Sequence, residues 1–417
     1  MQITRSAAAL AVVVTSCSLA AACAAPARQP RPPKPVVLSA AQVADLRAYG
    51  SGDTAFGLNV LSALCRAKPG GNVVISPLSL ATGLGMAYLG ARGATATAMA
   101  RVLHLPASGP GLTEGLRARA DLLRSLDRPG VLFAASNRIW ADPSLVTRAS
   151  FAAELRAAYQ AGLTRLPLLS RPEQARRQIN AAVAKTTRGH IAGLLPPGSL
   201  GQVGWVLTDA LYLNARWRHP FNHAMTSSEP FSTGTGKVTA KYMSGQSFAV
   251  AKADGWTAAA LPYRGGRLSM LALLPPAGPA GAVPSGCELP TPAEVATLAG
   301  DVGTAPHLVI SIPKVKLATS ASLRPVLTGL GMGIAFGGSA DFSGLSPQAC
   351  CIGFVQHAAT LDMAEKGTVA SAATAVGVLP SAAAITLDFD RPYLLVLRDA
   401  LTGEPIMLAW VADPAAS

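Results

Sequence analysis

The chain has few charged residues and few aromatic ones. Only 14% of its 417 residues are Asp, Glu, Lys or Arg, and 5% are aromatic. No run of Lys and Arg is interleaved with aromatic residues, as is typical of nucleic-acid-binding surfaces, so we expect no nucleic-acid partner. The formal net charge of +13 then reflects frequent use of arginine. Attraction to anionic polymers, membranes or acidic proteases is the alternative.

Cysteine and histidine are also rare, with six residues of each. No Cys-x-x-Cys pair or histidine cluster indicates a zinc site. His219 and His223 are four positions apart, but Pro220 follows the first and is unsuited to a helical metal site. The chain also lacks the Gly-x-Ser-x-Gly elbow of many hydrolases. We therefore expect no metal, no cofactor and no enzymatic activity, with an enzyme as the rival hypothesis.

The chain has no hydrophobic run that is long enough to cross a bilayer. The longest apolar stretch near the N-terminus, Ala7–Val14, follows Arg5 and is too short, but it is typical of an export signal. Leu19–Cys23 resembles a bacterial lipoprotein cleavage site, at which the Cys23 thiol accepts diacylglycerol. Cys17 is a second candidate, and a plain secretory signal is the alternative. We expect a lipoprotein-type signal peptide over residues 1–22 and a lipid on Cys23.

The remainder divides into a tether and one domain. Residues 23–39 are rich in proline and are expected to be extended. No internal linker or repeat interrupts residues 40–417, which we interpret as a single domain. The protein is then exported, and it is either extracellular or held on the outer face of the cell membrane by the lipid alone.

Export permits disulfides, but the cysteines do not dictate a pairing. Cys65 lies on an apolar helical stripe, so we expect it to be a buried free thiol. Cys287 has no assigned state. Adjacent cysteines such as Cys350 and Cys351 rarely pair with each other because the geometry is strained.

Apolar periodicity gives a coarse outline of the domain. It predicts helices over residues 40–66, around Leu80–Tyr88 and from Phe151 to Leu163. Strand patterns dominate after residue 203, and residues 393–397 and 406–411 predict a hairpin across Thr402 and Gly403. Early helices and late antiparallel strands indicate an α+β domain.

The segment from Glu365 to Leu387 has an unusual composition. After Lys366 it carries no charge until Asp388, and its first half is almost entirely Ala, Ser, Thr, Val and Gly. An exposed loop of this length is usually more polar, and a buried strand usually has larger side chains. The composition suits a segment that is exposed in one state and enters a crowded sheet in another.

Short motifs occur in a fixed order around this segment. They are Asn72–Ser79, Asp209–Trp217 with Pro220-Phe221, Leu261–Tyr263, Leu273–Pro275, Ile312–Lys314, Glu365–Thr368, Asp390–Tyr393 and Asp413-Pro414. As a set they are similar to the serpin family of serine protease inhibitors. The resemblance implies a fold of about nine helices around three mainly antiparallel β-sheets, with an exposed reactive-centre loop.

The resemblance also implies suicide inhibition. A serine protease attacks the loop and forms an acyl-enzyme, and the loop then inserts into the main sheet as an extra strand and carries the protease with it. The hinge would comprise Glu365, Gly367, Thr368, Ala370, Ser371, Ala372, Ala373 and Thr374. Alternate residues of a strand share a face, and the set Thr368, Ala370, Ala372 and Thr374 contains no charged or large residue. Insertion is therefore unobstructed at its start.

Counting from the hinge with the family's usual spacing places the scissile bond at Ser381-Ala382. A shift of one or two residues is an open alternative. The preceding Val378, Leu379 and Pro380 would contact the protease. A small residue in the primary pocket favours elastase-like or subtilisin-like extracellular proteases. We expect the inhibitor to be a monomer. The alternative is a non-inhibitory binding protein of the same fold.

The resemblance also assigns residues to the sheet. His357 would lie beneath its centre near Ser76 and Ser79, as a latch that opens for insertion. The family's usual Asn on the crossing strand is Asp209 here, which either accepts a bond from a charged His357, making opening pH-sensitive, or repels nearby carbonyl groups.

Two further expectations concern charged residues. Glu365 is expected to form an exposed ion pair with Lys314 beside Trp217, where the loop enters, contributing about 0–1 kcal/mol. Arg117, Arg119 and Arg124 are expected on a solvated helix face, with polyanion binding as the alternative.

Overall fold

The computed structural model describes residues 39–106, 111–127, 130–159, 161–201, 203–276, 278, 283, 286–368 and 386–416. The α-helices in this part of the chain are α1 (Ala40–Ala67), α2 (Pro77–Tyr88), α3 (Gly93–Val102), α4 (Leu112–Arg124), α5 (Ala149–Tyr159), α6 (Pro172–Thr186), α7 (Pro292–Asp301) and α8 (Arg324–Leu327). Three further helical turns are η1 (His223–Met225), η3 (Thr328–Met332) and η4 (Gly333–Phe336).

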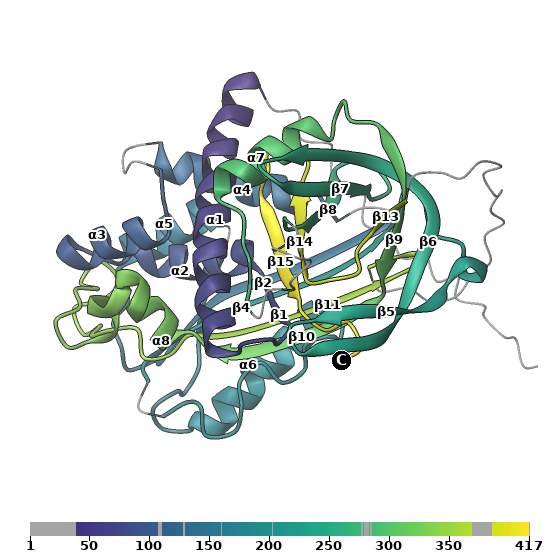
Figure 1. Ribbon diagram of the computed structural model, residues 1–417. Coiled ribbons are helices and arrows are strands. Elements are labelled where there is room, and N and C mark those ends of the chain that lie inside the picture. The colour runs from purple at the N-terminus through teal and green to yellow at the C-terminus, as the bar shows by residue number, and fades with distance from the viewer. Residues whose placement is uncertain are drawn as a thin grey trace, which may run out of the picture. The chain divides into compact units, whose positions relative to one another are not determined.

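A six-stranded sheet crosses the domain in the order β10-β11-β12-β4-β2-β3 (Figure 1). Its strands are β2 (Val131–Ala141), β3 (Leu163–Arg165), β4 (Trp205–Arg216), β10 (Val315–Ser322), β11 (Gln356–Ala364) and β12 (Gly367–Thr368). The motif expected to cross the sheet centre, from Asp209 to Arg216, lies in β4. That strand is paired with β2 over eleven positions, from Val131↔Ala215 to Ala141↔Trp205.

The remaining strands form a nine-stranded set. They are β1 (Val73–Ile75), β5 (Ser227–Thr233), β6 (Gly236–Ala253), β7 (Trp256–Pro262), β8 (Leu268–Leu274), β9 (His307–Pro313), β13 (Thr386–Asp388), β14 (Tyr393–Asp399) and β15 (Pro405–Val411). The long strand β6 joins two groups, because its first half pairs with β5 and its second half with β7. Counted as two sheets, this set and the six-stranded sheet give the three expected sheets.

Both faces of β8 and β14 are covered, which explains their uninterrupted apolar sequences. Leu395 and Leu397 of β14 pack toward the six-stranded sheet, whereas Leu394 and Val396 pack toward α1 and α7. A strand buried on both sides needs apolar residues at every position. On the far face of the six-stranded sheet, α6 covers the outward side chains of β2 and β4, including Trp140. The described residues confirm the predicted α+β fold, with eight α-helices.

Two local predictions need correction. The third predicted helix ends at Tyr159, and Leu163 instead begins strand β3, paired with Ile139 of β2. Cys65 is not a free thiol: it forms a disulfide with Cys287, and their Cα atoms are 5.9 Å apart. Helical periodicity showed that Cys65 is buried, but its partner lies 222 residues away in the sequence.

Arg119 is also not on a solvated face. Its side chain is buried between α1 and the β14–β15 turn, where it forms ion pairs with Asp53 and, at 3.0 Å, with Glu404. Removing one member of such a group leaves an unpaired buried charge. Arg119 is therefore unavailable to a polyanion, whereas Arg117 and Arg124 are exposed and lie near Asp121 of the same helix.

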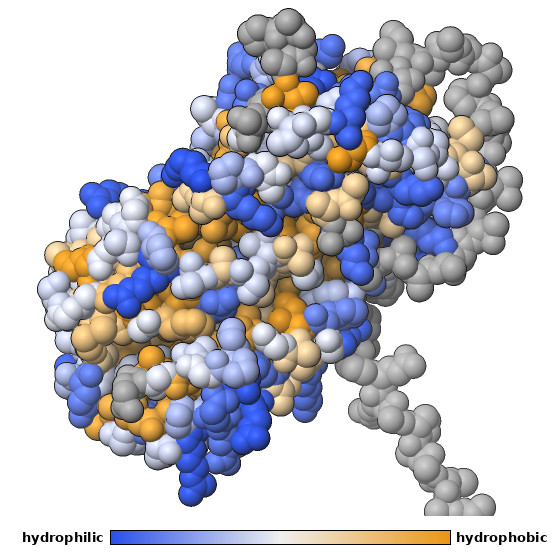
Figure 2. All heavy atoms as spheres, turned by 60° about the horizontal axis from the view of Figure 1, so that its bottom comes forward, coloured by the Kyte–Doolittle hydropathy of each residue, from blue (hydrophilic) through white to orange (hydrophobic). Residues whose placement is uncertain are grey.

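None of the helices in the described part of the chain is long and apolar enough to cross a membrane. On the face shown in Figure 2, hydrophobic residues are visible mainly between projecting hydrophilic side chains. Exposed large hydrophobic side chains are few among the described residues, with Val146 at 58% and Leu401 at 38%.

Candidate functional site

The candidate site begins where β11 ends. After Ala364 the chain turns through Glu365 and Lys366 and returns as β12, a two-residue strand between β11 and β4. Thr368 is aligned with Met363 on one side and with Ala215 on the other. Gly367 and Thr368 of the predicted hinge thus already occupy a strand position in the centre of the six-stranded sheet.

Gly367 permits this tight return. Its φ is +144°, a conformation that residues with a side chain rarely adopt. A Cβ atom at this position would collide with the backbone carbonyl oxygen of Ala215. The close approach of β12 to β4 therefore requires glycine at position 367, a residue that the sequence predicted to be part of the hinge.

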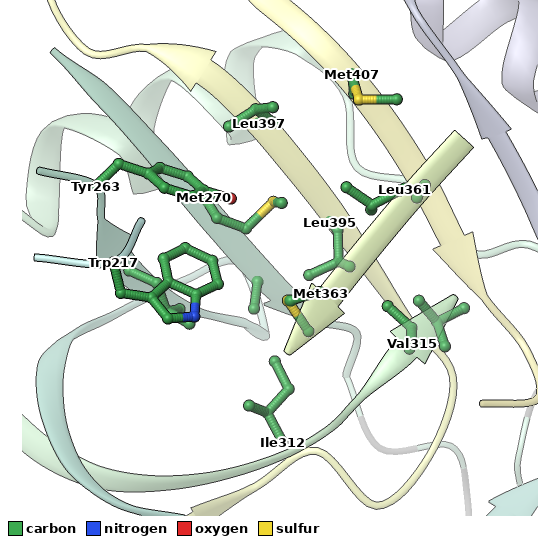
Figure 3. Packing of buried hydrophobic residues seen from close by; sticks show 14 of the residues in the cluster. Trp217, Tyr263, Met270, Ile312, Val315, Leu361, Met363, Leu395, Leu397 and Met407 are labelled. Carbon is green, nitrogen blue, oxygen red and sulfur yellow. The ribbon is translucent and has the colours of Figure 1, made fainter. Parts of the chain in front are cut away.

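Trp217 anchors the turn from the side of β4. Its backbone N–H donates to the Lys366 carbonyl at 2.9 Å, and its indole N–H donates to the Ala364 carbonyl at 2.9 Å. Figure 3 shows its ring beside that of Tyr263, with ring centroids 4.3 Å apart. The Tyr263 hydroxyl lies 2.6 Å from the Thr368 hydroxyl, and Thr368 is buried. The sequence predicted Trp217 at this place, and it predicted Tyr263 as part of a strand motif but not its contact with Thr368.

The Glu365 carboxylate is the polar centre of the turn. It accepts a hydrogen bond from Lys314 at 3.1 Å, as predicted, and it also contacts His223 and Thr226 at 2.9 Å each. The prediction that this ion pair is exposed was wrong, because only 9% of the Glu365 side chain is exposed. His223 and Thr226 were missed because nothing local in the sequence relates them to a carboxylate 142 and 139 residues away.

These hydrogen bonds stabilise the ionised form of Glu365. Burial alone would raise the pKa of its carboxyl group, but a backbone hydrogen bond and those from His223, Lys314 and Thr226 outweigh burial and lower the pKa to about 2. The group is therefore a carboxylate at neutral pH, and it holds the turn to Lys314 between β9 and β10, to His223 of η1 and to Thr226, which follows η1.

Beyond Thr368 the two strands that flank β12 are no longer joined. β4 is paired with β2 and β11 with β10 along their outer edges. Within the described residues, no register pairs residues 205–214 of β4 with residues 356–362 of β11. A sheet with such a position between two strands can accept a further strand through backbone hydrogen bonds.

The other end of this position is closed by buried polar groups. Ser76 caps α2: its hydroxyl accepts from the Ser79 N–H at 3.1 Å and donates to the Ile406 carbonyl at 2.7 Å. The Ser76 N–H donates to Nε2 of His357 at 3.1 Å. His357, at the start of β11, is 2% exposed. The structure thus brings Ser76, Ser79 and His357 together.

Burial lowers the pKa of His357 to about 4. Its Nε2 atom accepts a hydrogen bond, so that nitrogen carries no proton in this conformation. A hollow lies next to it, lined by Leu80, Gly83 and Leu84 of α2 and by Leu207 of β4. Of the two alternatives for Asp209, the one that requires a charged His357 therefore does not apply to this state. Asp209 lies in β4, but its side chain is outside what the structure describes.

Several predicted site residues lie outside the described residues. They are Cys17, Cys23, Ala370, Ser371, Ala372, Ala373, Thr374, Val378, Leu379, Pro380, Ser381 and Ala382. Among the described residues, no group of three or more His, Cys, Asp or Glu side chains could hold a metal ion. The site as described consists of the space between β4 and β11 and of two groups of polar residues at its ends, one around Glu365 and one around His357.

The family model for serpins, described as serine protease inhibitors, matches residues 51–414. Serpin B6 of Macaca fascicularis is 31% identical over 378 residues, covering 86% of this chain and 97% of that protein. A serpin-like protein of Thermococcus kodakarensis is 31% identical over 355 residues, covering 82% and 81%. The leukocyte elastase inhibitor of Bos taurus is 29% identical over 379 residues, covering 87% and 98%.

Solved structures show the same fold. Human glycosylated kallistatin superposes with a TM-score of 0.75 at 24% identity, covering 89% of this chain and 99% of that one. Thyroxine-binding globulin in complex with thyroxine gives 0.73 at 22% identity, covering 88% and 99%. Together with the family match and the arrangement of β4, β11 and β12, these comparisons show that the chain belongs to the serpin family.

Proposed function

We propose that this serpin is an inhibitor that acts as a suicide substrate for extracellular serine proteases. The protease would be acylated at Ser381-Ala382, and the loop would then insert between β4 and β11. The observation that carries the proposal is the position of β12: Gly367 and Thr368 already pair with both strands, which share no register beyond them. Insertion then extends a strand that has already begun.

The position between β4 and β11 that continues from β12 matches the sequence of the loop in length and in side-chain size. Residues 205–214 of β4 would accommodate a strand of ten residues, about 33 Å at roughly 3.3 Å per residue. Ten residues after Thr368 end at Val378. The side chains that would share the buried face with Thr368 begin with Ala370, Ala372 and Thr374, none of which brings a charge into the interior.

The sequence of the loop favours elastase-like or subtilisin-like targets. Ser381, preceded by Pro380, suits a shallow primary pocket, and no Arg or Lys lies near the bond. The leukocyte elastase inhibitor among the relatives is in keeping with this class. We propose that the inhibitor acts as a monomer and needs no cofactor.

We also propose that the chain is exported, with residues 1–22 as signal peptide, residues 23–39 as tether and Cys23 as the lipid acceptor. It then lies on the outer face of the cell membrane or in the extracellular space. The disulfide between Cys65 and Cys287 supports export, because such bonds persist in oxidising compartments. Labelling with a radioactive fatty acid tests the anchor: Cys23→Ser should abolish incorporation and Cys17→Ser should not. The opposite result would move the acceptor to Cys17.

The inhibitory proposal is tested by mixing the mature chain with an elastase-like and a subtilisin-like protease, followed by denaturing gels and mass spectrometry. We expect a stable one-to-one covalent adduct and release of a peptide that begins at Ala382. Loop cleavage that leaves the protease fully active would show a substrate instead. The alternative, a surface-anchored binding protein of serpin fold, would then be favoured.

A further inference from the structure

Cys350 and Cys351 play no part in the proposed inhibition, yet their thiols are in contact. The two Sγ atoms lie 2.7 Å apart, and neither cysteine is in a disulfide. Cys350 is exposed and Cys351 is partly exposed. Cys350 is therefore accessible to small reagents in solution, and Cys351 is partly accessible.

The chain on both sides of the pair is fixed by hydrogen bonds. The Ala349 N–H donates to the Ser346 carbonyl at 3.2 Å, and Ser346 is buried. On the other side, the Ile352 N–H donates to the Ala335 carbonyl at 2.9 Å, and Ile352 is buried. The two thiols are thus kept adjacent by the folded protein, which gives each a high effective concentration toward the other.

The two thiols differ in their surroundings. Cys351 lines a hollow with Trp205 and Leu207 of β4. Burial and the neighbouring thiol raise the pKa of Cys351 to about 11. Because thiolates are the nucleophiles in exchange reactions, the more exposed Cys350 is the sulfur that reacts first with an external disulfide.

We propose that Cys350 and Cys351 form a dithiol site that small-molecule disulfides oxidise to a vicinal disulfide. The Cys350 thiolate attacks one sulfur of the external disulfide and releases a first small thiol. The Cys351 sulfur then attacks Cys350, forms the Cys350–Cys351 bond and releases a second small thiol. Two cysteine thiols are oxidised, one external disulfide is reduced, and the two protons leave on the two small thiols.

The same chain contains a disulfide of the opposite character. Cys65–Cys287 joins α1 to the segment before α7, and Cys65 is buried. A bridge between adjacent residues closes a strained ring, and strained or exposed disulfides are the labile ones. Cys350–Cys351 is thus expected to change its redox state under conditions in which Cys65–Cys287 stays intact.

The test equilibrates the full chain with a series of glutathione buffers of increasing oxidised fraction. Free thiols are then trapped with N-ethylmaleimide, and the peptide that contains residues 350 and 351 is analysed by mass spectrometry. The wild type should change from two maleimide adducts to none, with loss of two hydrogen atoms. In Cys351→Ser, Cys350 should accumulate the glutathione adduct, at least about tenfold above the wild-type level because the second step is absent.

The peptides of Cys65 and Cys287 serve as an internal reference and should stay cross-linked throughout. Two results would overturn the proposal. One is a wild-type chain that accumulates the glutathione adduct to the level of Cys351→Ser. The other is a wild-type chain that keeps two maleimide adducts in the most oxidising buffer.

Discussion

The two ends of the space between β4 and β11 are closed in different ways. At one end the strands are joined by β12, and the turn before it is held by the carboxylate of Glu365. At the other end no strand among the described residues joins them, and His357 is bound to the first turn of α2 through the Ser76 N–H. One end, called the filled end below, is therefore occupied by Gly367 and Thr368. At the other end, the proposed insertion would have to break the contact between His357 and Ser76.

For the proposed insertion, this difference indicates where the loop would start and what would oppose it. Extending β12 adds backbone hydrogen bonds on both of its sides without a new nucleation step. The contact between His357 and Ser76 joins β11 to α2, so it opposes the separation of β11 from β4. Because the two ends depend on different ionisable groups, they can be perturbed separately.

The largest effect is expected at the filled end. In Thr368→Arg a charge would enter a site that is 2% exposed, at a cost of several kcal/mol, so β12 should leave the sheet. An insertion barrier raised by about 1.4 kcal/mol slows the step tenfold and lets the acyl-enzyme hydrolyse. The excess of inhibitor consumed over one mole per mole of protease, which measures hydrolysis relative to insertion, should rise at least about tenfold, measured by titration of residual protease activity.

Thr235→Arg is the matched control, because it makes the same change at an exposed turn between β5 and β6. Its stoichiometry should equal that of the wild type. An unchanged stoichiometry in Thr368→Arg would contradict insertion through β12.

The next largest effect concerns the end closed by His357. Because its pKa is lowered to about 4 in the folded state, the unfolded chain binds the proton first as the pH falls. The contribution of neutral His357 to stability is therefore fully present above about pH 6.5, and it is lost as the pH falls toward 4. Over this range, the free energy of unfolding should fall by about 3 kcal/mol more in the wild type than in His357→Gln, measured by denaturant titration at each pH.

Gln at this position can still accept the Ser76 N–H but does not titrate. His307→Gln removes an exposed histidine and should keep the wild-type pH dependence. Parallel curves for the wild type and His357→Gln would show that His357 is not the titrating group.

The sequence indicated each end to a different degree, for physical reasons. Gly367 and the small residues after it were recognisable because backbone conformation and side-chain size are local properties. The fold followed from an ordered set of motifs, but the end of α5 at Tyr159 did not, because apolar spacing continues past it. Periodicity shows which residues are buried and not where a buried helix stops.

Contacts between distant segments were accessible only where a motif linked them. The pair of Lys314 and Glu365 was predicted in this way. No local pattern relates His223 or Thr226 to Glu365, and Tyr263 was recognised in a strand motif without its contact to Thr368. The burial of Arg119 was missed for the same reason, since its partners Asp53 and Glu404 lie on separate elements. A charged residue can be placed in a core only when its counter-charge is known.

Glu365→Gln should weaken the filled end by a smaller amount. The change removes the charge that Lys314 and His223 contact. We expect the free energy of unfolding to fall by about 1–2 kcal/mol, since His223 is exposed to solvent and Lys314 is partly exposed. Hydrogen exchange at the amides of Gly367 and Thr368 should accelerate. Glu154→Gln, at an exposed position of α5, is the control and should leave these amides unchanged.

The contributions of Glu365 and His357 to stability can also be distinguished by their pH dependence. The pKa of Glu365 is lowered to about 2. The contribution of its carboxylate to stability is therefore fully present above about pH 4.5 and is lost as the pH falls toward 2. The filled end should therefore keep its protection between pH 6.5 and 4.5, where the His357 contribution already declines. Equal protection of Gly367 and Thr368 in Glu365→Gln and wild type would exclude the carboxylate as the anchor.

The smallest expected effect tests whether side-chain contacts or strand pairing hold β12 in place. Tyr263→Phe removes only the hydroxyl that lies 2.6 Å from that of Thr368, and it keeps the ring stacked on Trp217. We expect a loss of about 1 kcal/mol in the free energy of unfolding and an unchanged stoichiometry of inhibition. If backbone pairing with Met363 and Ala215 holds β12, insertion still starts from the same register. A stoichiometry that rises as in Thr368→Arg would instead show that the hydroxyl contact fixes the start of insertion.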